Sequence, residues 1–331
     1  MLNDDARISA RTRDRVTSAA IELGYVGSFS ASSLASGRNS NISVLLPGLN
    51  SWFFSSVVER ISASLLKERF DLTLYNSGGG TRHGALCDDF LLRRRVDAII
   101  VVASKLSTDE IARLLTIRMP AVVVGGSAPG ISTISIDETA ASAAATAHLV
   151  DLGHQRIAHV SGLVDDGPSF STSTRHREGY EATMNQVDLR VLKQWIVSAK
   201  STVAGGYEAA MRLLVLPTQE RPSAILSSSD EMAVGVIFAA KEFGFTVPGD
   251  LSVIGIDGNE LGEAFSLTTV NQFAQEQGRR AVQHLRAQLC APRTEYVSSN
   301  EIFSSKLIPR SSTGAPCRPE IGRIAAISSE R

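Results

Sequence analysis

Short apolar runs alternate with longer amphipathic stretches along the chain from residue 42 onward. Residues 42–46, 96–102 and 251–256 are runs of aliphatic and β-branched residues, and runs of this length are typical of buried parallel strands. The stretches between such runs place apolar residues at helical spacing. This alternation of strand and helix predicts an α/β fold with parallel sheets.

The alternation starts again after residue 162, which predicts two doubly wound parallel-sheet lobes of similar design. Further strands are expected at residues 71–75, 121–124, 156–161, 223–226 and near 195–197. Helices are expected over residues 55–69, 82–94, 107–116, 139–152 and 205–214, and after Arg177.

One strand–helix–strand unit, residues 222–257, ends its strands in polar residues. Three serines, residues 227–229, follow the first strand, and Asp230 is expected to cap the helix, which Gly244 can end. Asp257 ends the second strand. Ligands of such units bind outside the carboxyl ends of the strands, so this unit predicts half of a small-molecule site.

Composition limits the class of protein. The 331 residues carry a net charge of -1 and are 43% hydrophobic, which is enough for two compact domains and argues against a uniformly basic surface. Cys87, Cys290 and Cys317 lack metal or redox spacing. Neither a signal peptide nor an apolar run long enough to cross a bilayer is evident, so we expect a soluble cytoplasmic protein.

The sequence contains no motif that indicates a catalytic site. The three glycines at residues 78–80 follow a strand but lack the lysine and hydroxyl residue of a nucleotide loop. The six histidines lack metal spacing on one helix, and no nucleophile elbow occurs. We therefore expect no catalytic residues, no metal and no cofactor.

The first 41 residues differ in character from the rest. Ser9 can cap a helix that runs to about Leu23, in a segment with arginines at positions 7, 11, 13 and 15. Residues 28–41 are small and polar and are typical of a linker. Within them only residues 31–35 predict a short helix, with Leu34 as its single large apolar residue.

Several motifs, in this order and spacing, resemble the LacI/GalR family of bacterial transcription regulators over nearly the full length. They include TRDRVTSAAIELGYV at residues 12–26, ISVLLPGLNSWFF at 42–54, HLVDLGHQRI at 148–157, VPGDLSVIGID at 247–257 and LTTVNQ at 267–272. The resemblance implies an N-terminal helix-turn-helix, a hinge helix and a two-lobed periplasmic-binding-protein-like core that forms a homodimer.

The resemblance also implies domain boundaries. Residues 1–27 are a remnant of the helix-turn-helix domain and residues 28–41 the hinge. The first lobe is expected at residues 42–162 with the helix 274–291, and the second at 163–273 with strands at 295–312. Residues 313–331 are expected to form a loose tail.

The DNA-binding part departs from the family pattern. The first residues resemble the sequence that in the family follows the recognition helix, so we expect operator binding to be impaired. An upstream start, a natural truncation and a shortened chain all stay open as explanations. In the hinge, Leu34 keeps the place of the residue that wedges into the minor groove. Ala31 and Arg38 accompany Leu34, and Arg38 is the nearest cation.

The resemblance implies an effector site between the lobes. Asp257 would accept hydrogen bonds from hydroxyl pairs, and its alternative role is a helix cap. The family's arginine three residues before the Gly-Tyr glycine is replaced by His176, and which of Arg175, His176 and Arg177 faces the cleft stays open. The full set of expected effector contacts is Asn50, Trp52, Phe53, Asp137, His176, Arg177, Ser229, Asp257, Gln272 and Phe273.

Aromatic residues in this set favour a ring-shaped ligand. Trp52 and Phe53 would stack on its flat apolar face, with a core position as the alternative for Phe53 and the preferred one for Phe54. The expected effector is a sugar or sugar acid, with a nucleobase-like ring as the alternative. We therefore expect an effector-responsive transcription regulator of repressor type; a ligand-binding protein that does not bind DNA is the alternative, and an α/β enzyme is the least supported hypothesis.

Overall fold

The computed structural model describes residues 9–24, 39–76, 96–103, 106–163, 172–292 and 297–317 of the chain. The expected helix at 82–94, the hinge residues Ala31, Leu34 and Arg38, and the end of the tail lie outside these residues. Helix α1 (Ala10–Glu22) is present as expected. The Ser9 hydroxyl accepts a hydrogen bond from the Thr12 N–H at 3.3 Å, and Gly24 takes the left-handed conformation, with φ 60°, after the helix.

The first lobe is built on a six-stranded sheet in the order β11-β5-β4-β3-β1-β2. All its pairings are parallel. Its strands are β1 (Asn41–Leu46), β2 (Asp71–Asn76), β3 (Ala98–Val102), β4 (Ala121–Val124), β5 (Ser132–Ile136) and β11 (Asn300–Phe303). Its helices are α3 (Trp52–Lys67), α5 (Thr108–Thr116) and α11 (Ala274–Cys290), and α3 and α11 pack against each other.

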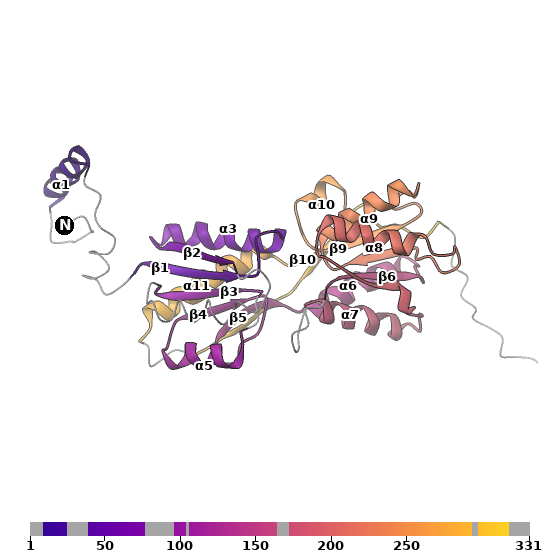
Figure 1. Cartoon of the computed structure of the whole chain (residues 1–331), viewed down its shortest axis with the longest axis horizontal. Coiled ribbons are helices and arrows are strands. Elements are labelled where there is room, and N and C mark those ends of the chain that lie inside the picture. The colour runs from indigo at the N-terminus through magenta and orange to yellow at the C-terminus, as the bar shows by residue number, and fades with distance from the viewer. Residues whose placement is uncertain are drawn as a thin grey trace, which may run out of the picture.

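The second lobe is built on another six-stranded sheet, in the order β12-β10-β9-β8-β6-β7. Among the described strands of this sheet, only β12 is antiparallel to its neighbour. Its strands are β6 (Ile157–Gly162), β7 (Ile196–Ala199), β8 (Ala224–Ser227), β9 (Ser252–Asp257), β10 (Thr268–Asn271) and β12 (Lys306–Ile308). Its helices are α6 (Glu138–Asp151), α7 (Thr172–Gln186), α8 (Val203–Leu214), α9 (Asp230–Glu242), the short α10 (Leu261–Ala264) and the 3-10 turn Lys193–Trp195. Figure 1 shows the two lobes side by side along the long axis.

Within the described residues the chain passes between the lobes at three points, and the first differs from the expected boundary at residue 162. It lies between β5 and α6, because α6 packs on α7, β9 and β10 and because β6 pairs with β8. The second follows β10, where α11 returns to the first lobe and packs on α3. The third lies between β11, which pairs with β5, and β12, which pairs with β10. The last two strands therefore belong to different lobes.

Several elements begin at other residues than expected. Helix α3 begins at Trp52 rather than at Ser55, and α7 begins at Thr172, so that Arg177 lies inside it. Strand β5 was not expected as a strand, because its residues alternate with hydroxyl residues. Those hydroxyls serve sheet pairing: Ser132 Oγ lies 3.3 Å from Ser299 Oγ, beside the junction with β11.

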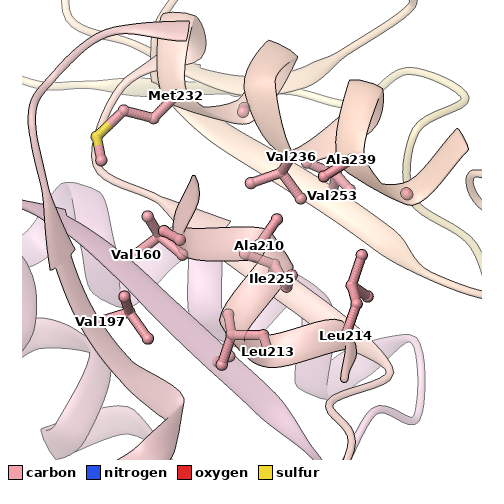
Figure 2. Close-up of a cluster of buried hydrophobic side chains, with 14 of the residues drawn as sticks. Val160, Val197, Ala210, Leu213, Leu214, Ile225, Met232, Val236, Ala239 and Val253 are labelled. Atoms are coloured by element: carbon pink, nitrogen blue, oxygen red, sulfur yellow. The ribbon is translucent and has the colours of Figure 1, made fainter. Parts of the chain in front are cut away.

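The core of the second lobe lies between α8, α9 and the sheet. Figure 2 shows Met232, Val236 and Ala239 of α9 facing Ala210, Leu213 and Leu214 of α8, with Val160, Val197, Ile225 and Val253 contributed by the strands. The two helices meet at backbone contact, because a Cβ on Gly206 would lie 2.1 Å from the Met232 carbonyl oxygen. Glycine is thus required where α8 crosses α9.

The segment after Ser312 is anchored at its start, unlike the loose tail expected from residue 313. Ser312 is 3% exposed, and the Gly314 N–H donates to Ser252 Oγ at 3.0 Å. The Thr313 hydroxyl lies 2.8 Å from that of Thr268. Within the described ranges, none of the helices has the length and apolar character needed to cross a membrane.

Candidate functional site

A cleft of about 310 Å³ lies between residues of the two lobes. The first-lobe wall is the segment from the end of β1 to the first turn of α3. The second-lobe wall is formed by the start of α9 and the loop from β9 to α10. Figure 1 shows α3 and α10 on the same side of the molecule. The cleft therefore lies outside the carboxyl ends of strands, where α/β sheets bind ligands. Its lining residues are Leu49, Asn50, Ser51, Trp52, Ser55, Glu231, Asn259, Glu260 and Leu261.

The first-lobe wall contains two of the expected effector contacts, Asn50 and Trp52. Trp52 is the first residue of α3 and is half-buried. Phe53 instead lies in the core of its lobe and is 9% exposed, whereas Phe54 is the more exposed of the two rings. Helix periodicity explains this placement, because Phe53, Val57 and Ile61 occupy the buried face at intervals of four residues.

On the second-lobe wall, Asn259 is held by two hydrogen bonds. Its backbone N–H donates to Asp230 Oδ2 at 2.8 Å, and its Oδ1 accepts from the Leu261 N–H at 2.8 Å. The side chain is 1% exposed, and its Nδ2 has no hydrogen-bond partner among the described residues. Few buried polar groups in proteins stay unpaired. Asn259 is therefore unusual in bringing an unsatisfied donor to a residue of the cleft wall.

A buried pair of carboxylates supports this loop from behind. Asp257 Oδ2 accepts from the Asp230 N–H at 3.2 Å, and Asp257 Oδ1 accepts from Gln272 Nε2 at 2.5 Å. Asp230 accepts from the Thr269 hydroxyl at 2.6 Å as well as from Asn259. Burial raises the pKa of Asp230 to about 6. Burial, and then the charge of Asp230, raise the pKa of Asp257 well above its ordinary value.

Asp257 is 5% exposed, so its carboxylate points into the second lobe more than into open solvent. The Asp257 carboxylate accepts from the first N–H of α9. Asp257 therefore acts as a helix cap, the alternative role named above, for a helix that precedes it by 27 residues. Its backbone has φ 150° and Gly258 has φ 76°. Such conformations cost about 1–3 kcal/mol each for a non-glycine residue and gather at functional sites.

Two expected contacts are helix caps in the structure. Ser229 caps α9, since its hydroxyl accepts from the Met232 N–H at 3.2 Å. Asp230, which we expected at the cap, is the first helical residue instead. Asp137 caps α6 by accepting from the Ala140 N–H at 2.9 Å. Asp137 also lies at the first crossing between the lobes.

The remaining expected contacts lie on or next to helices. His176 is 2% exposed, with its Nε2 2.8 Å from Glu138 Oε2. Arg177 is 53% exposed and pairs with Glu181 one turn later at 2.7 Å, so it faces outward from α7. Phe273 precedes α11 with φ 56°, and its N–H donates to Asn271 Oδ1 at 2.7 Å.

Sequence reasoning missed four residues of the second wall: Glu231, Asn259, Glu260 and Leu261. The strand-end rule that selected Asp257 could have found Asn259 and Glu260, which follow it directly. Burial raises the pKa of Glu231, and a hydrogen bond from the Trp52 backbone N–H opposes the shift. Glu231 therefore joins α9 to the start of α3 across the cleft. No group of His, Cys, Asp or Glu among the described residues could hold a metal ion.

Comparison with known proteins agrees with this arrangement. A family model described as a periplasmic binding protein-like domain matches residues 146–313. The ribose operon repressor of Escherichia coli K12 is 30% identical over 299 residues, covering 88% of this chain and 88% of the repressor. Catabolite control protein A of Priestia megaterium is 28% identical over 309 residues, covering 92% of this chain and 89% of that protein.

A solved structure is similar as well. The LacI family transcriptional regulator from Enterococcus faecium, with bound ribose, superposes with a TM-score of 0.72 at 26% identity. The match covers 83% of this chain and 99% of that one. The expected fold and family are thereby confirmed, and the relatives are transcriptional regulators rather than enzymes. The chain belongs to the LacI family of transcriptional regulators.

Proposed function

We propose that this protein is an effector-responsive transcriptional repressor whose effector is a small polyhydroxylated molecule, a sugar or a close relative, bound in the cleft between the lobes. The observation that carries the proposal is the cleft itself, which both lobes line at the carboxyl ends of their strands. Its volume of about 310 Å³ falls in the range of small-molecule sites.

The lining residues suit a hydroxylated ring. The Trp52 indole offers a flat face for the apolar side of a sugar. Asn50 offers an amide group that can both donate to and accept from hydroxyls, and Asn259 offers its unpaired Nδ2 as a donor. The E. coli relative is named for the ribose operon, and the E. faecium structure contains ribose; both support a carbohydrate ligand here.

The mechanism follows from differential binding. A ligand that contacts both walls stabilises the arrangement in which the walls are close, so it shifts the equilibrium between lobe arrangements. The three crossings are the segments about which the lobes can turn. In a cytoplasmic homodimer bound to operator DNA, that shift would change the fit of the DNA-binding segments to the operator.

Thermal-shift screening tests the ligand class. A ligand at 100 times its Kd adds about 2.7 kcal/mol of stability, so a matching sugar should raise the Tm clearly. Trp52→Ala and Asn259→Ala should abolish the shift, while Glu208→Ala on the exposed face of α8 should keep it. If sugars, sugar acids and purines all leave the Tm unmoved, the proposed ligand class is wrong.

A gel-shift titration separates a regulator from a ligand-binding protein that does not bind DNA. In line with the impaired operator binding expected from the sequence, we expect weak retardation of operator DNA that the effector changes and that falls steeply as salt rises. Retention of ligand binding with no DNA retardation at any salt concentration would favour the second class.

A further inference from the structure

The cleft has an asymmetric charge. Two of its lining residues, Glu231 and Glu260, are acidic, and among the described lining residues none is a lysine, arginine or histidine. Glu260 is exposed, whereas Glu231 is half-buried. A ligand in the cleft therefore meets negative charge on the second-lobe wall without a compensating side-chain cation.

Of the two carboxylates, the half-buried Glu231 is the less solvated, so its charge gains more from a positive partner than that of the exposed Glu260. Burial disfavours its charged form and raises its pKa, and the backbone N–H of Trp52 is the hydrogen-bond donor that opposes this. One N–H leaves most of the acceptor capacity of a carboxylate unused. The indole of Trp52 lines the same cleft, and the face of an indole attracts cations.

Asn259 supplies an independent observation on this wall. Its Oδ1 is engaged by the Leu261 N–H at 2.8 Å, so Nδ2 is the free end of the amide. That atom is buried and has no partner among the described residues. A buried donor without an acceptor costs about 1–3 kcal/mol, and a ligand hydroxyl or ring oxygen would satisfy it.

From these three features together we propose that the effector carries a cationic amino group as well as hydroxyls, as an amino sugar or a hydroxylated amine does. The ammonium lies between Glu231 and the Trp52 indole, and an oxygen of the ligand accepts from Asn259 Nδ2. This inference rests on the proposed function and narrows its ligand class. It also replaces the sugar acid expected from the sequence, because an anionic ligand would be repelled by Glu231 and Glu260.

Calorimetric titration with matched sugars tests the inference. The probes are D-glucosamine, D-galactosamine and D-mannosamine, each with its neutral parent and the corresponding uronic acid, at pH 7 and low salt. We expect at least one amine to bind at least tenfold more tightly than its neutral parent, no binding of its acid, and weakening of the amine's affinity as salt rises.

A pair of variants locates the charge. Glu231→Gln keeps the side-chain volume, so it should cut affinity for the amine at least tenfold more than it cuts affinity for the neutral parent. Glu263→Gln, an exposed residue of α10 outside the cleft lining, should change neither. Equal Tm values of the ligand-free proteins confirm that both variants are folded.

The outcomes separate the two proposals. If a neutral sugar or a uronic acid binds as tightly as the amine, or if Glu231→Gln leaves the preference intact, the amine inference is overturned and the sugar-binding proposal stands. If no compound in the panel binds at millimolar concentration, the amine inference is overturned, and the wider thermal-shift screen of sugars, sugar acids and purines decides whether the proposed ligand class stands.

Discussion

Asp230 connects three segments of the second lobe through its carboxylate and its backbone N–H. It accepts from Asn259 on the cleft wall and from Thr269 on β10, and its own N–H donates to Asp257 at the end of β9. It is fully buried, so solvent cannot replace these partners. The position of the unpaired Asn259 amide therefore depends on a residue that does not line the cleft.

Removing this carboxylate should destabilise the protein. Asp230→Ala leaves the Asn259 N–H and the Thr269 hydroxyl buried without an acceptor, at about 1–3 kcal/mol each. We expect the free energy of unfolding in urea at pH 7 to fall by roughly 2–4 kcal/mol. Glu208→Ala, on an exposed helix face, should change it by less than about 0.5 kcal/mol. A fall that small for Asp230→Ala would show that the network contributes nothing.

His159 should make the protein sensitive to acid. Its ring stacks on Tyr180 with centroids 5.4 Å apart, and burial lowers the pKa of His159 to about 3. Between pH 6.5 and pH 3 the unfolded chain binds a proton that the native state does not, so stability falls as pH falls through that window. At pH 5 this residue alone should cost about 2 kcal/mol.

The His159→Phe variant isolates that contribution, because a phenyl ring keeps the stack on Tyr180. We expect the difference in unfolding free energy, variant minus wild type, to rise by about 2 kcal/mol between pH 7 and pH 5. Urea unfolding at the two pH values measures it. A difference that stays constant would mean that His159 is protonated in the native state.

At the scale of elements, α8 and α9 depend on glycine where they touch. A Cβ on Gly206 would meet the Met232 carbonyl oxygen at 2.1 Å, and one on Gly235 would meet the Val203 carbonyl oxygen at 2.0 Å. Alanine has the higher helix propensity, so local preference alone would favour alanine at both positions. Packing outweighs that preference, because neither backbone can move without separating the helices.

Gly206→Ala should therefore destabilise despite its better helix propensity. We expect a loss of about 3 kcal/mol or more, at the upper end of overpacking costs, measured by urea unfolding. Gly244→Ala serves as the comparison, since its Cβ meets nothing within 4 Å and its φ of 76° costs only about 1–2 kcal/mol. Gly206→Ala being the milder change would contradict close packing of α8 on α9.

The elements best predicted from sequence are those whose burial is uniform. Strands β3 and β4 are apolar along their length, and β1 is buried from Ile42 to Leu46 and mostly apolar, so their runs are visible. Strand β5 was not recognised from the sequence, because Ser132 and Thr133 have their partners just before β11 and at its first residue, far away in sequence. The start of α7 was not recognised from the sequence, because its first two turns contain only polar or charged residues before Gly179. Of these, His176 is the buried one.

The candidate site was predictable only where a rule of topology applies. The strand-end rule and the family resemblance pointed to Asn50 and Trp52, which both line the cleft; their contact with an effector stays a prediction. Neither says how deep a side chain lies, so the burial of Phe53 and His176 could not be foreseen. Nor does the helical pattern of α6 reveal which sheet it covers, which is why the first lobe boundary differed from expectation.

At the scale of the whole molecule, two lobes of the same design are joined by three short crossings, after β5, after β10 and between β11 and β12. Between them, the contact from the Trp52 N–H to Glu231 connects the start of α3 to α9 at the cleft. A ligand that binds there interacts with both lobes. Occupancy of the cleft is thus the quantity that the regulatory account depends on.

Fluorescence of Trp52 measures that occupancy directly. The chain has two tryptophans, and Trp195 is 3% exposed in the second lobe, with its indole N–H donating to the Glu220 carbonyl at 2.7 Å. Emission of Trp195 should therefore be insensitive to the cleft. We predict that a compound which raises the Tm changes the emission of the wild type saturably, with a midpoint equal to its calorimetric Kd, and leaves Trp52→Phe emission unchanged. Calorimetric binding with no change in the emission of Trp52 would place the ligand elsewhere and contradict the account.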